Sequence, residues 1–138
     1  MATTTGTVLT DIAKTIDALT PASQASSGDI FRCGIGYIDT DSGPPKHRQV
    51  ELIGYGGKRV KECAEYDTQV IINIYYNNTS NAMVNACADA DQIIVALQTW
   101  VGTNTISVDY IQHDQAAPSP IPGGFVMTRA ISVHYRGE

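Results

Sequence analysis

The sequence lacks a long apolar run, because no stretch approaches the ~20 consecutive apolar residues that a membrane-spanning helix needs. Basic residues are also scarce, with 9 Lys and Arg against 14 Asp and Glu. Such an acidic chain is not expected to bind nucleic acid or an anionic membrane through general electrostatic attraction. The first ten residues are rich in threonine and have neither a basic start nor an apolar core, so we expect no signal peptide.

Cysteine is equally scarce, with only Cys33, Cys63 and Cys87 in the chain. No two of them have the spacing of metal ligands, and an odd count leaves at least one thiol outside any intramolecular disulfide. We interpret all three as small buried hydrophobes of a chain kept in a reducing compartment. The three histidines are scattered as well, so the sequence predicts neither a metal site nor a cofactor.

What remains is the composition of a globular domain, with 43% hydrophobic and 17% charged residues. A length of 138 residues fits one domain over residues 1–138. Apolar residues recur at helical spacing in residues 7–19 and, more strongly, in 81–101. For the second helix we expect a single buried stripe with these members: Met83, Ala86, Cys87, Ala90, Ile93, Ile94, Leu97, Trp100 and Val101.

Strand patterns lie between and after these helices. They cover residues 29–38, 49–55, 66–76, 106–111 and 125–135, while 58–65 are ambiguous and 112–124 read as a proline-rich loop. In the clearest strand, Val70, Ile72, Ile74 and Tyr76 face one side. We predict an α+β fold: a mainly antiparallel sheet of four or five strands with two helices packed on one face. The other face, with Tyr, Thr and Asn, suits water or a partner.

No segment matches a catalytic or ligand-binding motif. Residues 39–43 open like a calcium loop, but Pro44 stands where that loop needs glycine. The glycine-rich turn at 54–57 precedes Lys58, yet no Ser or Thr follows this lysine as in a phosphate-binding loop. Neither a nucleophile elbow nor a cysteine beside a histidine is present. We therefore predict that the chain is not an enzyme.

Surface features favour a protein interface instead. The only basic cluster is Lys58, Arg59 and Lys61, which lies close to Glu62 and Glu65. A local ion-pair surface and a docking patch for an acidic partner are both open interpretations of this cluster. Tyrosine is enriched in interfaces, so Tyr75 at the end of the clearest strand is a further candidate. The full set of predicted subunit or partner contacts is Tyr55, Lys58, Arg59, Lys61, Tyr75, His113 and Asp114.

The order of these elements resembles the tail terminator (tail-completion) proteins of long-tailed bacteriophages. Members of that family open with an amphipathic helix, here TVLTDIAKTIDAL at 7–19. A strand and an extended hairpin follow, here 49–76, and one long helix, here 81–101, precedes two final strands. The segment YDTQVIINI at 66–74 is the most family-like, whereas the loops at 39–48 and 112–124 have no counterpart in the family.

The resemblance implies a structural virion protein without enzymatic activity. Family members form a hexameric ring that caps the head-proximal end of the tail tube, ends tube polymerisation and joins the tail to the neck. The implied partners are other copies of the chain, the tail tube protein and a head-completion or neck protein. No cofactor, membrane or sequence-specific nucleic acid is implied, and the location is the virion, with assembly in the host cytoplasm.

Three alternatives to this resemblance stay open. The chain could be another phage neck or tail-tube connector protein. It could be a ferredoxin-like module that binds a small ligand close to the glycines around Gly34 and Gly54, or it could be an enzyme.

Overall fold

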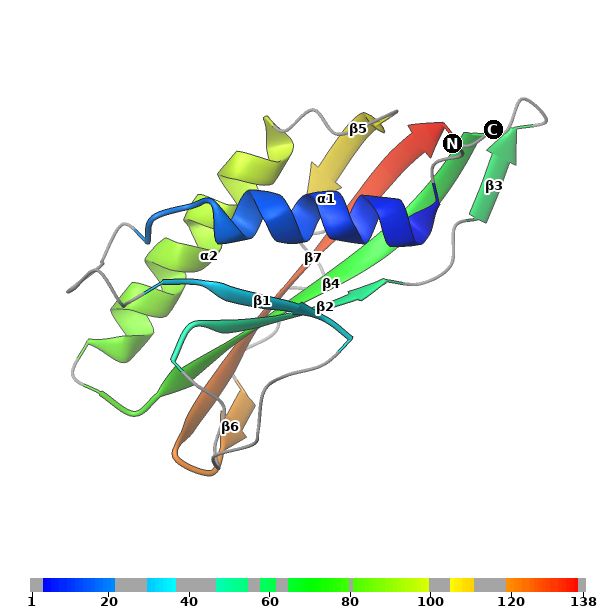
Figure 1. The fold of residues 1–138 in the computed structure, drawn as a ribbon. Helices are drawn as coiled ribbons and strands as arrows, with labels where there is room; N and C mark the ends of the chain where they lie inside the picture. The colour runs from blue at the N-terminus through cyan, green and yellow to red at the C-terminus, as the bar shows by residue number, and fades with distance from the viewer. Residues whose placement is uncertain are drawn as a thin grey trace.

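A computed structural model of the chain describes residues 4–21, 30–36, 47–54, 58–61, 65–79, 81–99, 105–110 and 119–136. The elements are α1 (Thr5–Asp17), β1 (Arg32–Ile35), β2 (Gln49–Gly54), β3 (Lys58–Lys61), β4 (Glu65–Asn77), α2 (Ala82–Gln98), β5 (Thr105–Tyr110), β6 (Ser119–Ile121) and β7 (Gly124–Arg136). Both helices pack on the same face of one sheet (Figure 1), so the predicted α+β class is confirmed.

Helix α1 begins two residues earlier than the sequence predicted, because Thr4 caps it. The Thr4 hydroxyl accepts a hydrogen bond from the Thr7 backbone N–H at 3.2 Å, and the Thr7 hydroxyl accepts one from the Thr4 N–H at 3.4 Å. This reciprocal capping box satisfies backbone donors that the first turn would otherwise leave without partners. Gly6 therefore lies inside the first turn of the helix.

The two longest strands form the centre of the sheet, in the order β1-β2-β4-β7-β5. Strand β4 pairs with β7 in antiparallel register along all 13 of its residues, from Glu65 opposite Arg136 to Asn77 opposite Gly124. The other edge of β4 is shared by β2 and β3, and the other edge of β7 is shared by β5 and β6.

The predicted strand count was too low, and one pairing was missed. The described residues form seven strands in a mixed sheet, where we expected four or five mainly antiparallel ones. The segment after Gly57, which the sequence left ambiguous, is strand β3, because it pairs with the start of β4. Strands β1 and β2 are parallel, with Cys33 opposite Val50, although the remaining pairings are antiparallel.

Part of the predicted proline-rich loop is a short edge strand, β6. Strand β6 turns directly into β7 through Pro122 and Gly123, and Gly123 has a φ of 78°. This pair suits a type II turn, because proline is favoured at its first central position and glycine at its second, where φ is positive. Pro120 is tolerated inside β6 because the strand lies at an edge, where a missing backbone donor costs little.

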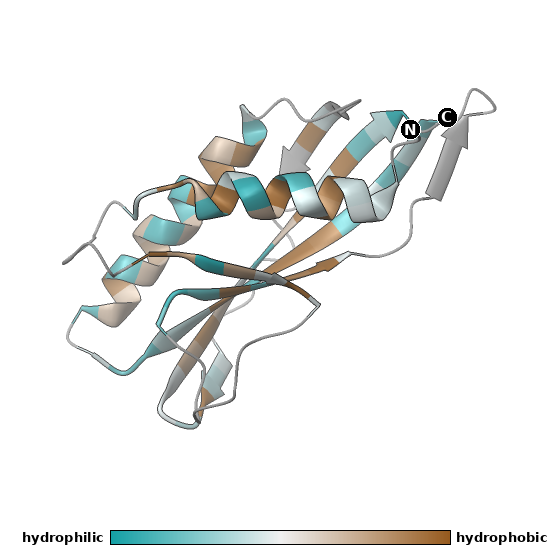
Figure 2. Cartoon of the chain, viewed as in Figure 1, coloured by the Kyte–Doolittle hydropathy of each residue, from teal (hydrophilic) through white to brown (hydrophobic). Residues whose placement is uncertain are grey.

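The predicted inward face of β4 is confirmed. Val70, Ile72, Ile74 and Tyr76 are fully buried beneath the helices, together with Ile131 and Val133 of β7. Figure 2 shows hydrophobic segments along these strands where they pass beneath α1. On the other face, side chains such as Asn73 and Tyr75 are half-buried, and no helix of the described ranges covers them.

Helix α2 contains the predicted core stripe in part, and two of its predicted members, Trp100 and Val101, lie outside the described residues. Ala86, Ala90, Ile93, Ile94 and Leu97 are buried as predicted, and the described helix ends at Gln98. Met83 and Cys87, which we placed in the stripe, are exposed, so the buried face is narrower than the sequence indicated. No helix in the described part of the chain is long and apolar enough to cross a membrane.

Gly124 is expected to tolerate no side chain. A Cβ atom at this position would lie 1.8 Å from the carbonyl oxygen of Tyr76, and a backbone atom cannot rotate away. We expect Gly124→Ala to lower the free energy of unfolding by about 3 kcal/mol, at the upper end for overpacking. The matched control is Gly123→Asn, because this site is open and asparagine tolerates a positive φ. Equal urea midpoints for the two variants would contradict the packing described here.

Candidate functional site

The helix-free face of the sheet carries a row of hydrogen-bonded polar side chains, which we call the polar ladder: Glu51, Asn73, Tyr75 and Thr128. Glu51 Oε1 accepts hydrogen bonds from Asn73 Nδ2 at 3.3 Å and from the Tyr75 hydroxyl at 3.4 Å. The Thr128 hydroxyl donates to Asn73 Oδ1 at 2.8 Å. The ladder therefore crosses β2, β4 and β7, three neighbouring strands whose side chains alternate between the two faces.

Tyr75 is the one predicted interface residue whose side chain the structure describes. Its pKa is raised above the usual 10.0, first by burial and then by the charge and the hydrogen bond of Glu51. The phenol therefore stays neutral and keeps its proton directed at the carboxylate. This arrangement offers donors and acceptors for binding, on a sheet face that the described helices leave uncovered.

A second group of polar side chains continues this face toward the start of β4 and the end of β7. His134 Nε2 lies 3.4 Å from Glu65 Oε2, and His134 Nδ1 lies 3.6 Å from Asp67 Oδ1. Arg136 Nη2 lies 3.6 Å from Glu65 Oε1. His134 is therefore a partly exposed side chain that lies between two carboxylates.

The predicted basic cluster lies beside this charged group. In the register of β3 and β4, Lys58 is opposite Asp67 and Lys61 is opposite Glu65. Opposite charges on directly paired positions stabilise an antiparallel pair. The backbone register of β3 and β4 therefore favours the interpretation of the basic cluster as a local ion-pair surface. The side chains of β3 lie outside the described part of the structure. Tyr55, His113 and Asp114 also lie outside the described residues.

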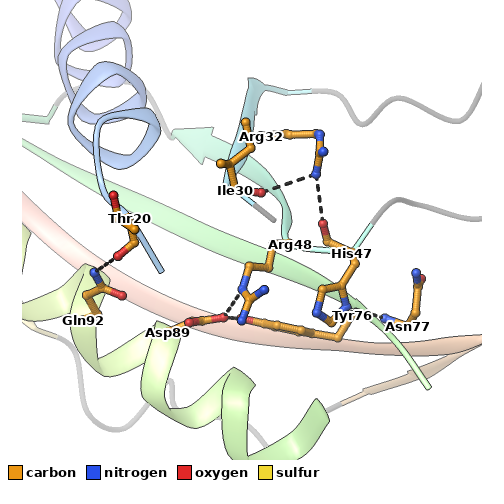
Figure 3. Close-up of polar contacts among 9 residues, drawn as sticks. All are labelled: Thr20, Ile30, Arg32, His47, Arg48, Tyr76, Asn77, Asp89 and Gln92. Atoms are coloured by element: carbon orange, nitrogen blue, oxygen red, sulfur yellow. Dashed lines mark hydrogen bonds and ion pairs between the residues drawn. The ribbon is translucent and has the colours of Figure 1, made fainter. Parts of the chain in front are cut away.

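A second polar cluster is completely buried between the sheet and α2, and we call it the buried triad: Arg48, Tyr76 and Asp89. Arg48 Nε donates to Asp89 Oδ2 at 2.7 Å, and the Tyr76 hydroxyl donates to the same oxygen at 2.8 Å (Figure 3). The side chains of Arg48 and Asp89 are 0% exposed. Burial, followed by the charge of Asp89, strongly raises the pKa of Tyr76, so this phenol stays a donor.

The buried triad fixes the segment that leads into β2. Arg48 has a left-handed φ of 61°, its N–H donates to Tyr75 O at 2.8 Å, and its carbonyl accepts from the Arg32 N–H at 3.1 Å. The His47 ring stands edge-on to the Tyr76 ring at 5.2 Å between centroids. Because solvent does not reach the triad, its role is structural. It holds β1, β2, β4 and α2 in place.

Sequence reasoning missed this triad, although one signal for it was present. Asp89 is three residues after Ala86 and four before Ile93, so it occupies a position of the apolar stripe. An acidic residue at a core position needs a buried partner. Nothing local identifies that partner as Arg48, which is 41 residues away.

Comparisons with known proteins add no assignment. No protein-family model matches this sequence, and no curated protein is significantly similar to it. Within the described residues, no group of three or more His, Cys, Asp or Glu side chains is placed to hold a metal ion. The architecture and these surfaces are therefore the basis on which a function is proposed.

The cysteines depart from the predicted burial. Cys87 is exposed on α2, Cys33 is half-buried in β1, and Cys63 lies outside the described residues. Cys33 is anchored through its backbone, since its N–H donates to Asp17 Oδ1 at 3.0 Å. Burial and the nearby Asp17 charge raise the pKa of the Cys33 thiol to about 12.

We expect Cys33 to make the protein less stable in alkali. The thiol ionises near its ordinary pKa of 9.0 in the unfolded chain but only near 12 in the folded chain. The unfolded state therefore loses its proton first, and stability falls as the pH rises from about 9 to about 12. Urea unfolding across this range should show a shallower loss for Cys33→Ala than for the native chain. Cys87→Ala is the control, and an unchanged slope in Cys33→Ala would contradict the prediction.

Proposed function

We propose that this chain is a ring-forming, non-enzymatic structural protein of the tail terminator kind. In this role it caps the head-proximal end of a phage tail tube, ends tube polymerisation and presents a surface to neck proteins. The single observation that carries the proposal is the one-sided architecture. Two helices cover one face of a sheet, and the polar ladder lies on the face that no described helix covers.

The order of elements supports the same proposal. The chain runs from a helix through four strands to a longer helix and three final strands. A ferredoxin-like module, our alternative, has only two strands between its helices. The four strands between α1 and α2 therefore favour the terminator-like interpretation over that ligand-binding one.

The charge of the chain fits a ring through which DNA passes. Each copy has a formal net charge of -5 at pH 7. A ring of such acidic copies repels the phosphate backbone instead of binding it. We therefore propose that its partners are proteins, namely other copies, the tube protein and the neck protein.

The experiment measures the mass of the chain by light scattering over a wide concentration range, with negative-stain images of each fraction. Closed rings of about six copies with a central hole are the expected result, because a head-to-tail contact that closes generates a ring. When purified tail tube protein is added to the rings, its tubes should stop growing at the end that a ring caps. Tubes that elongate equally with and without the chain would overturn the proposal.

A further inference from the structure

Strand β7 places one charged side chain on the face of the sheet that the helices cover. Arg129 lies directly opposite the fully buried Ile72 of β4, so both side chains point to this covered face. Its neighbours on the same face of β7 are Met127 and Ile131, which are both buried. Arg129 itself is only 6% exposed, so most of the side chain is removed from water. Such a charge is costly unless a counter-charge pairs with it.

The guanidinium of Arg129 is bound on one side only. Nη1 donates to the Thr128 carbonyl oxygen at 2.8 Å and to Met127 Sδ at 3.2 Å. Nε and Nη2 have no hydrogen-bond partner among the described residues, yet neither atom is completely buried. These two N–H groups form the fork with which an arginine binds both oxygens of a carboxylate. The fork is therefore in contact with solvent, although the rest of the side chain is buried.

The described acidic residues leave Arg129 without a counter-ion. Glu51, Glu65 and Asp67 lie on the helix-free face, which is the opposite side of the sheet. Asp89 lies on the covered side, but its carboxylate belongs to the buried triad. No ion pair joins Arg129 to any carboxylate of the described residues.

Arg129 also lies where the strands beside β7 are interrupted. Strand β5 ends opposite Ile131, and β6 begins opposite Val126. Residues 127–130 of β7 therefore pair with β4 on one side and with no described strand on the other. Figure 1 shows β5 and β6 at opposite ends of β7. The interruption agrees with the solvent contact of Nε and Nη2.

We propose that Arg129 is a carboxylate-binding site, in which Nε and Nη2 donate to the two oxygens of one carboxylate. The carboxylate belongs to a small acid or to another copy of the chain. Its single negative charge balances the single charge of the guanidinium. A phosphate group has a charge near -2 at neutral pH, so it would bring excess negative charge into a largely buried site of a chain whose net charge is already -5. The inference does not depend on the proposed ring.

Acetate is the probe for this site. In a proton–nitrogen NMR spectrum, the Nε–H signal of Arg129 is the one that disappears in Arg129→Met. We expect sodium acetate at pH 7 to shift this signal along a binding curve that gives a Kd, whereas sodium chloride at equal ionic strength leaves it in place. At an acetate concentration of ten times this Kd, the ratio of folded to unfolded protein in urea should rise about tenfold. A signal that acetate leaves in place would overturn the inference.

Substitutions of Arg129 separate a binding site from a structural role. Arg129→Met removes the buried charge and keeps an apolar side chain, so in chloride it should be at least as stable as the native chain, and acetate should not stabilise it specifically. Arg129→Lys keeps the charge without the fork, so it should lose most of the response. Lys14→Met is the matched control, because Lys14 is an exposed cation on α1. If acetate stabilised Arg129→Met as much as the native chain and Lys14→Met, the site would be refuted.

Dilution distinguishes the two sources of the carboxylate. If another copy supplies it, the Arg129 signal should move with protein concentration, and acetate should weaken self-association. If a small acid supplies it, the signal should not depend on protein concentration and should respond to acetate alone. Asp114→Asn tests the chain itself, since Asp114 is the one carboxylate in residues 111–118, between β5 and β6. This variant should bind acetate like the native chain, and a clearly lower Kd would identify Asp114 as an internal counter-ion and overturn the inference.

Discussion

Replacing Asp89 by alanine is expected to lower the free energy of unfolding by about 3–5 kcal/mol. The carboxylate is fully buried and accepts two short hydrogen bonds, from Arg48 and from Tyr76. Removing it leaves the Arg48 charge inside the protein without its carboxylate partner. The cost is therefore larger than the pair itself contributes, because a buried charge that has lost its counter-ion keeps its full desolvation penalty.

Asp91 provides a control on the same helix. It lies two residues further along α2 and is exposed, so Asp91→Ala should change the free energy of unfolding by no more than about 0.5 kcal/mol. Tyr76→Phe removes one of the two hydrogen bonds and keeps the ion pair, so its expected loss is about 1–3 kcal/mol. Urea unfolding followed by circular dichroism gives the order Asp89→Ala, Tyr76→Phe, Asp91→Ala. If Asp89→Ala were as stable as Asp91→Ala, the triad would not hold α2 to the sheet.

Local pattern predicted those parts of the fold that depend on local spacing. The alternation in β4 correctly placed Val70, Ile72, Ile74 and Tyr76 on the covered face, because a strand has only two faces. The helix boundaries were correct to within a few residues, since apolar periodicity and caps are local properties. The interior of the domain was therefore largely predictable.

Pairing between distant segments could not be predicted in the same way. Strand β6 contains a proline and looks like a loop, yet it is a strand because the Pro122–Gly123 turn brings it onto the edge of β7. The parallel pair of β1 and β2 likewise depends on the path of the chain between them. Met83 and Cys87 fit the apolar spacing but are exposed, because the width of a buried helix face is set by what the sheet covers.

The predicted interface residues divide in the same manner. Tyr75 lies on the helix-free face, as strand alternation indicated, but its bond to Glu51 depends on the register of β2 and β4. The exposure of Val84, Val95 and Ile35 was not predicted, since all three looked like ordinary apolar residues of their elements. Only the folded chain shows that their side chains are left uncovered.

Leu97→Ala carries the other large expected effect, because Leu97 belongs to the buried face of α2. Leu97 is fully buried on α2, so its truncation should lower the free energy of unfolding by about 2–5 kcal/mol through lost apolar burial and the cavity left behind. Val95 is two residues away and 60% exposed, so Val95→Ala should cost at most about 0.5 kcal/mol in the same urea titration. A loss below about 1 kcal/mol for Leu97→Ala would contradict its placement in the core, because deleting a buried leucine side chain costs more than that.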